Sequence, residues 1–109
     1  MSSSERQPTK YTLKFLPEAL QEWGRLDGSV KTTFKNLLRK RLDAPHVPGS
    51  ALRGDLQHCY KIKLLKQGYR LVYTVEDDVL VVLVLAVDKR EDMAAYRAAV
   101  QRLSEDLER

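Results

Sequence analysis

Several residue types are scarce in this chain of 109 amino acids, and each scarcity excludes a class of protein. The single cysteine, Cys59, excludes an internal disulfide framework, and no residues show paired metal-ligand spacing, so we expect neither a metal nor another cofactor. The longest apolar run, Val79 to Val87, has nine residues, whereas a membrane-spanning helix needs about 20. The polar residues 1–9 lack the apolar segment of a secretory signal. These absences predict a cytoplasmic protein with no membrane partner and a reduced thiol.

Positive charge is concentrated in the middle of the chain. Residues 31–70 contain ten Lys or Arg and two acids, a net charge of +8, while the remaining residues have a net charge of −4. If this segment folds into one surface, it attracts polyanions such as nucleic acids. Solvated cations on a helix and a hairpin explain the same pattern equally well, and an acidic protein partner would use the same field.

The first half of the sequence predicts one strand and two helices after a mobile tail at residues 1–9. Alternation predicts the strand from Lys10 to Leu16. Apolar residues at helical spacing predict helices from Pro17 to about Leu26 and from Val30 to Leu42. In the turn between them, Gly28 is expected to adopt the left-handed conformation and Ser29 to cap the second helix. So short a turn favours an antiparallel helical hairpin.

The second half predicts three strands and a last helix. The strands are expected at His58–Leu65, Tyr69–Val75 and Val79–Val87, and the helix starts at about Asp92. Because residues 79–87 are apolar on both faces, the last strand should be central and covered on both sides. We therefore predict one α+β domain over residues 10–109, with helices against a small, mostly antiparallel sheet.

The predicted hairpin places three cations on one face of the sheet. With Gln67 and Gly68 as a two-residue loop, Leu64 faces Leu71, Ile62 faces Tyr73 and Lys61 faces Thr74. Lys61, Lys63 and Arg70 then share the face opposite the apolar residues, with no acid on these two strands to neutralise them. A solvent-facing side of an edge hairpin is the alternative explanation, because lysines there also discourage aggregation.

Other polar residues have ordinary structural explanations on spacing alone. Arg90 fits a surface arginine in the charged connector after the third strand, and Tyr96 fits the apolar stripe of the last helix. Asp88 fits a capping or surface group. His46 and His58 have no partner acid or hydroxyl in a recognisable arrangement.

A combination of short motifs resembles the RelE family of bacterial toxins from type II toxin–antitoxin systems. The motifs are Leu-Arg-Gly at 52–54, Tyr-Lys-Ile-Lys at 60–63, Gly-Tyr-Arg-Leu-Val-Tyr at 68–73, Lys-Arg-Glu at 89–91, and Tyr96. Each motif alone is weak, but their order and spacing over about residues 10–103 make the combination specific. The tail at residues 1–9 and the acidic C-terminal end depart from the family pattern.

The resemblance implies a ribosome-dependent endoribonuclease that enters the decoding A site and cuts the messenger RNA there. The positions that would carry catalysis are Lys61, Lys63, Arg70, Arg90 and Tyr96. Further contacts to RNA and ribosome are expected from Arg53, Lys31, Lys35, Arg39 and Lys40. The resemblance also implies a RelB-like antitoxin with a segment that wraps the toxin and blocks or displaces the last helix. The net charge of +8 over residues 31–70 predicts that this segment is acidic or presents acids to the toxin.

Metal-free cleavage by attack of a ribose 2′-OH is the chemistry that these residue types permit. Tyr96 or Lys61 is expected as the base, Lys63 and Arg70 as phosphate ligands, and Arg90 on the leaving-group side. Two alternatives remain open at this stage. One is a gyrase-inhibiting toxin of the ParE type, which shares the fold but generally lacks this Lys, Arg and Tyr set; the other is a binding module without activity.

Overall fold

The computed structural model describes residues 9–89 and 91–107, which form one α+β unit. In chain order its helices and strands are β1 (Thr12–Phe15), α1 (Pro17–Gly24), α2 (Gly28–Asp43), β2 (Cys59–Leu64), β3 (Tyr69–Glu76), β4 (Val81–Lys89) and α3 (Ala94–Leu107). Short 3-10 turns, which the sequence did not predict, occur at η2 (Pro48–Ser50), η3 (Gly54–Leu56) and η4 (Glu91–Met93). The predicted fold class and element order are confirmed. Of the tail predicted at residues 1–9, residues 1–8 lie outside the described residues.

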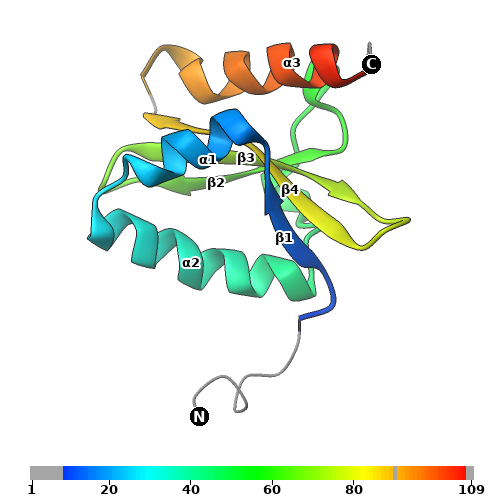
Figure 1. Cartoon of the computed structure of the whole chain (residues 1–109), viewed down its shortest axis with the longest axis horizontal. Coiled ribbons are helices and arrows are strands. Elements are labelled where there is room, and N and C mark those ends of the chain that lie inside the picture. Colours follow the sequence, from blue (N-terminus) through cyan, green and yellow to red (C-terminus); the bar gives the residue numbers. More distant parts are fainter. Residues whose placement is uncertain (1–8, 90, 108–109) are drawn as a thin grey trace.

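The four strands form one sheet in the order β1-β4-β3-β2 (Figure 1). Strands β2, β3 and β4 pair antiparallel to one another, whereas β1 runs parallel to β4. The central position predicted for the strand at Val79–Val87 is therefore confirmed, because β4 has a neighbouring strand on each side. An irregularity between Val72 and Tyr73 leaves Leu85 of β4 without a partner in the ladder. As a result, Leu85 and Ala86 both pack on the same side of the sheet.

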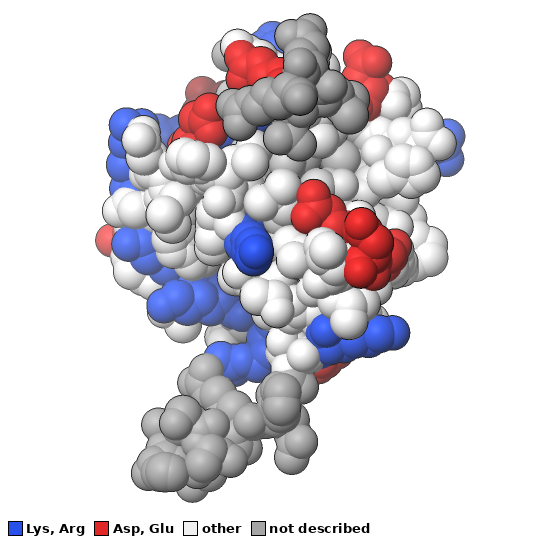
Figure 2. All heavy atoms as spheres, turned by 45° about the vertical axis from the view of Figure 1, so that its right-hand side comes forward, with Lys and Arg blue, Asp and Glu red and all other residues white. Residues whose placement is uncertain are grey.

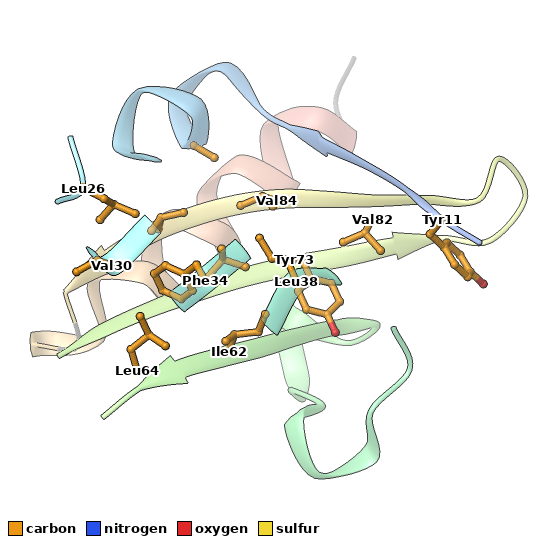
Figure 3. Close-up of a cluster of buried hydrophobic side chains, with 13 residues drawn as sticks. Tyr11, Leu26, Val30, Phe34, Leu38, Ile62, Leu64, Tyr73, Val82 and Val84 are labelled. Atoms are coloured by element: carbon orange, nitrogen blue, oxygen red, sulfur yellow. The ribbon is translucent and has the colours of Figure 1, made fainter. Parts of the chain in front are cut away.

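Helices cover both faces of the sheet, with α2 and α3 on opposite sides (Figure 1). On one face, α1 and α2 pack against β2, β3 and β4, and Figure 3 shows Phe34 and Leu38 of α2 over the strands beside Ile62 and Tyr73. On the other face, the small side chains of Ala95 and Ala99 lie in a second cluster with Val72 and Leu85. Alanine at these positions lets α3 approach the sheet closely. The side of the sheet under α3 is the one that also bears the predicted cations.

The two N-terminal helices begin where local sequence favours it, although one cap differs from the prediction. Pro17 occupies the first turn of α1, where its missing N–H costs nothing. Asp27, not Ser29, is the N-cap of α2, because its carboxylate accepts hydrogen bonds from the Ser29 backbone N–H (3.3 Å) and hydroxyl (2.6 Å). Gly28 is the first residue of α2 and has no positive φ, so the expected left-handed turn is wrong.

The β2–β3 hairpin has a different register from the predicted one. Lys61 pairs with Val72, Lys63 with Arg70 and Leu64 with Tyr69, which leaves a four-residue loop in place of two. A two-residue hairpin loop needs positive φ at both central residues or at the first of them, whereas of Gln67 and Gly68 only the second, Gly68, has it (φ 77°). The Gly68 N–H instead donates to the Leu64 carbonyl at 2.8 Å. Since the error is two residues, every side chain still lies on its predicted face.

Among the described residues, no helix combines the length and the apolar character that crossing a membrane requires.

Candidate active site

Lys61, Lys63 and Arg70 lie on the face of the sheet that α3 covers. Lys63 is paired with Arg70, and Lys61 is paired with Val72, which is completely buried beneath α3. Residues directly opposite in an antiparallel pair point to the same face. The side chain of Lys63 is exposed, while those of Lys61 and Arg70 are half-buried. The three cations therefore line one side of the hairpin, as the alternation predicted.

Tyr96 joins this set from the first turns of α3. The guanidinium carbon of Arg70 lies 4.5 Å from the centre of the Tyr96 ring, a cation–π geometry. One terminal nitrogen of Arg70 is 3.4 Å from the sulfur of Met93 in the turn before the helix. The Arg70 Nε is buried and has no hydrogen-bond acceptor among the described residues. Soft contacts hold this arginine, and within the described residues its guanidinium forms no ion pair that would compete with an anionic oxygen.

An acid from the neighbouring strand corrects one part of the electrostatic prediction. Asp88 of β4 pairs with Arg70 across the sheet, so it belongs to the same row as Lys63 and Arg70. Its carboxylate accepts a hydrogen bond of 2.7 Å from the Lys89 backbone N–H within β4. The strand predicted to end at Val75 continues to Glu76, which lies on the same face as Arg70 but at the far end of β3. β4 adds Asp88 directly beside Arg70, so the cationic row ends at a carboxylate.

The other predicted basic residues divide between two layers of the molecule. Arg53 is exposed immediately before η3, which packs against α3 through Leu56. The basic residues of α2 are in the opposite layer: Lys35, Arg39 and Lys40 are exposed and Lys31 is half-buried. Basic and acidic side chains occupy separate areas of one face in Figure 2, with Lys and Arg densest toward the lower left. The segment of net charge +8 thus forms two basic surfaces and not one patch.

Arg90, the fifth predicted catalytic residue, lies outside the described residues. Its neighbour Lys89 is the exposed last residue of β4, and η4 begins at Glu91. The structure therefore brings Lys61, Lys63, Arg70 and Tyr96 to one face, and the role expected for Arg90 stays a prediction.

Among the described residues, neither a reactive thiol nor a metal centre is found on this face. Cys59 is buried beneath α3, and burial raises the pKa of its thiol, which disfavours the reactive thiolate. Within residues 9–89 and 91–107, no cluster of three or more His, Cys, Asp or Glu could hold a metal ion. The chemistry that the described residues offer is cationic stabilisation of an anion beside a phenol.

Comparison with known proteins identifies the family. A family model described as the ParE toxin of the type II toxin–antitoxin system parDE matches residues 13–94. A RelE-like toxin protein of Escherichia coli is 45% identical over 94 residues, which cover 86% of this chain and 98% of the relative. This chain belongs to the RelE/ParE family of type II toxins.

The individual relatives are RelE proteins. The mRNA interferase toxin RelE of Escherichia coli is 44% identical over 93 residues, covering 85% of this chain and 97% of the relative. The structure of a variant of that toxin in the free state has a TM-score of 0.79 at 42% identity and covers 86% of this chain and 98% of its own. The toxin in the intact RelBE toxin–antitoxin complex has a TM-score of 0.71 at 44% identity, covering 74% and 98%. The family resemblance and fold predicted from the motifs are confirmed.

Sequence reasoning missed several residues that support this toxin fold. Met93 has a positive φ of 59° and contacts Arg70, and no local pattern distinguishes it. Glu22 and Arg102 form an ion pair between α1 and α3, 80 residues apart in the chain. The only local signal for Arg102 is its place beside the apolar stripe of the last helix. Partners so distant in sequence can be recognised only once the helices are placed.

His46 also has an acidic partner that the sequence did not reveal. Its Nε2 lies 3.1 Å from the Asp77 carboxylate, which also accepts a 2.6 Å hydrogen bond from the Tyr11 hydroxyl. The hydrogen bond from Tyr11 is the main cause of a lowered pKa at Asp77, and the same bond raises the pKa of Tyr11. This cluster joins the residue before β1, the loop after α2 and the β3–β4 turn.

Replacing Asp77 with asparagine is expected to reduce stability at neutral pH and to flatten its acid dependence. A carboxyl whose native pKa lies below its ordinary value of 3.8 stabilises the fold fully above that value. This contribution is lost as the pH falls through the lower native pKa. Urea unfolding of the wild type and of Asp77→Asn at several pH values between 2 and 7 measures the difference. Asp78→Asn is the matched control, and equal pH profiles for wild type and Asp77→Asn would contradict the assignment.

Proposed function

We propose that this toxin is an mRNA interferase that cleaves messenger RNA in the A site of the ribosome and so inhibits translation in the cytoplasm. The observation that carries the proposal is the convergence of Lys61, Lys63, Arg70 and Tyr96 on the sheet face beneath α3. Two relatives are named mRNA interferases. Each is 44% identical to this chain, and the match covers 97% of its length. A phosphodiester carries anionic oxygens, and within the described residues the guanidinium of Arg70 is not paired with a carboxylate.

The reaction that we propose is attack of a ribose 2′-oxygen on the adjacent phosphorus. The 2′-OH loses its proton to a base, the new P–O bond forms, and the bond to the 5′-oxygen breaks as that oxygen gains a proton. Tyr96 or Lys61 takes the 2′-OH proton, while Lys63 and Arg70 stabilise the negative charge on the phosphoryl oxygens. Arg90 acts on the leaving-group side, and the products are a 2′,3′-cyclic phosphate and a 5′-hydroxyl.

The basic surface of α2 is suited to contact with ribosomal RNA. Lys35, Arg39 and Lys40 are exposed on a helix that lies across the sheet from the proposed site. Contacts of lysine and arginine with RNA phosphates position a protein without reading the base sequence. Arg53 adds an exposed cation on the α3 side. We propose that these residues orient the toxin so that the A-site message meets the catalytic face.

The proposed protein partner is a RelB-like antitoxin with an acidic segment. A solved relative at 44% identity is described as an intact RelBE toxin–antitoxin complex, and another as RelE bound to a RelB peptide. Two exposed basic surfaces on this chain offer complementary charge to acidic residues of such a segment.

Mapping message ends after brief induction of the toxin tests the proposal. We expect new 5′ ends inside codons of translated regions in cells that express the wild type, and none after Arg70→Ala. The family model carries the name ParE, so a gyrase-directed toxin is the competing function. DNA damage without message cleavage would establish that alternative and refute the nuclease.

Cleavage is expected to depend strongly on the ribosome. The proposed acid–base groups are tyrosine, lysine and arginine, whose ordinary pKa values are near 10 or higher and suit proton transfer poorly at pH 7. Precise placement of the message must supply much of the acceleration, so naked RNA should react on the order of 100-fold more slowly or worse. Single-turnover assays of one message, free and ribosome-bound, give the ratio. Equal rates on free and ribosome-bound message would contradict the proposal that placement by the ribosome supplies much of the acceleration.

A further inference from the structure

The outer edge of β4 is completed by two side chains where its neighbouring strand stops. β1 pairs with β4 only as far as Phe15 and Val84, and the Leu16 N–H then donates to the Val84 carbonyl at 3.0 Å. Beyond this point Arg102 Nη1 donates to the Leu85 carbonyl at 2.6 Å. The Val87 N–H donates to Glu22 Oε1 at 3.0 Å. Glu22 and Arg102 therefore supply the acceptor and the donor that a longer β1 would have supplied.

The same two side chains, here called the edge pair, are bound to each other. Arg102 Nη1 lies 2.9 Å from Glu22 Oε1, and Nη2 lies 2.9 Å from Oε2, which is a bidentate arrangement. Their side chains are only 15% and 18% exposed, so solvent screens the interaction much less than it screens a surface pair. The hydrogen bond that Arg102 donates to Glu22 raises the pKa of Arg102. The edge pair is a fixed junction and not a mobile surface contact.

This junction connects helices that cover opposite faces of the sheet. Glu22 belongs to α1 and Arg102 to α3. Among the described side chains of α3, Ala95 and Ala99 are the completely buried ones, and Tyr96, Val100 and Leu103 are partly buried around them. Two buried alanines contribute little apolar area, so packing alone holds this helix less firmly than a helix with fully buried leucines. Tyr96 lies on the same helix and stacks on Arg70. A displacement of α3 would move the phenol away from the cationic row.

We infer that Glu22 and Arg102 are positioning residues that hold α3 on the edge of the sheet and thereby place Tyr96 against Arg70. The effect of the edge pair on the position of Tyr96 is inferred from the geometry alone. The effect of that position on catalysis rests on the proposed mRNA interferase function. The hydrogen bonds of the edge pair go to each other and to the backbone of β4, and not to Lys61, Lys63 or Arg70. Its effect on the reaction is therefore transmitted through the helix.

Hydrogen exchange of the full chain under native conditions tests the attachment of α3. In Glu22→Gln the amide oxygen still accepts from Val87 N–H, but the charge and one ionic acceptor of the guanidinium are lost. We expect amides of α3 to exchange on the order of 10- to 100-fold faster, as for loss of a charged hydrogen-bond partner, while β3 and β4 keep their protection. Glu105→Gln makes the same charge change at an exposed position on α3 and should leave exchange unaltered.

Two further measurements separate positioning from general destabilisation. The ring resonances of Tyr96 should move toward those of a free tyrosine in Glu22→Gln. Arg102→Lys, which keeps the charge and one donor, should show a smaller effect on both exchange and resonances. Normal α3 exchange and unchanged Tyr96 resonances in both variants would overturn the inference, and so would an equal loss of protection throughout the sheet.

Single-turnover cleavage on the ribosome tests the catalytic consequence. Glu22→Gln should lower the rate in the wild-type background but add nothing to the defect of Tyr96→Ala, because the edge pair acts through Tyr96. The same rate loss in the wild-type and Tyr96→Ala backgrounds would show that the edge pair does not act through Tyr96, which contradicts the inference. A wild type that cleaves no message would refute the proposed function, and the exchange data would still decide whether the edge pair holds α3.

Discussion

Replacement of Arg70 by alanine is expected to lower the rate of message cleavage on the ribosome by about 100- to 1,000-fold. Arg70 presents a guanidinium whose Nε has no acceptor within the described protein and whose plane lies beside Tyr96. Loss of one preorganised donor to a developing oxyanion has an effect of this size in other enzymes. The substitution also removes the cation beside Lys63, so phosphate binding and transition-state stabilisation should both suffer.

Single-turnover kinetics with a defined ribosome complex measure this effect. Arg70→Lys keeps the charge but loses the planar fork, and we expect an intermediate rate. Arg25→Ala removes an exposed arginine at the end of α1, outside the proposed site, and should cleave like the wild type. Thermal unfolding and α3 hydrogen exchange show whether the variant keeps its fold. A folded Arg70→Ala protein with wild-type kinetics would remove Arg70 from the mechanism.

The largest loss of stability is expected from Phe34→Ala. Phe34 of α2 is completely buried among the side chains that pack on this face of the sheet (Figure 3). Its ring centre lies 6.0 Å from that of Trp23 of α1. Truncation of a buried phenylalanine removes apolar burial and leaves a cavity, so the free energy of unfolding should fall by about 3–5 kcal/mol. That is a large part of the roughly 5–15 kcal/mol that stabilises a typical domain.

Urea unfolding followed by Trp23 fluorescence and by far-ultraviolet circular dichroism measures this loss. Leu20→Ala on α1 is the matched control, because Leu20 is 54% exposed and its truncation should cost less than about 0.5 kcal/mol. A loss below about 1 kcal/mol for Phe34→Ala would show that this face of the sheet is not packed as described.

The β2–β3 hairpin illustrates why the face of each side chain could be predicted although the register between the two strands could not. Side chains alternate along a strand with a period of two, so the apolar positions Ile62, Leu64 and Leu71 identify the core face without knowledge of the partner strand. The loop length depends on backbone conformation at Gln67 and Gly68, which a single sequence specifies weakly. The resulting register error of two residues changed the neighbours of Lys61 and Lys63 but not their face.

The amino-acid sequence by itself determined the order of the helices and strands, the central place of β4 and the shared face of Lys61, Lys63 and Arg70, because each depends on local periodicity. Only the tertiary structure decided that Tyr96 stacks on Arg70, that Asp88 ends the cationic row and that Glu22 meets Arg102. These contacts join segments whose relative placement depends on how complete helices pack on a twisted sheet. No local spacing records that packing, because its free energy is distributed over many distant side chains.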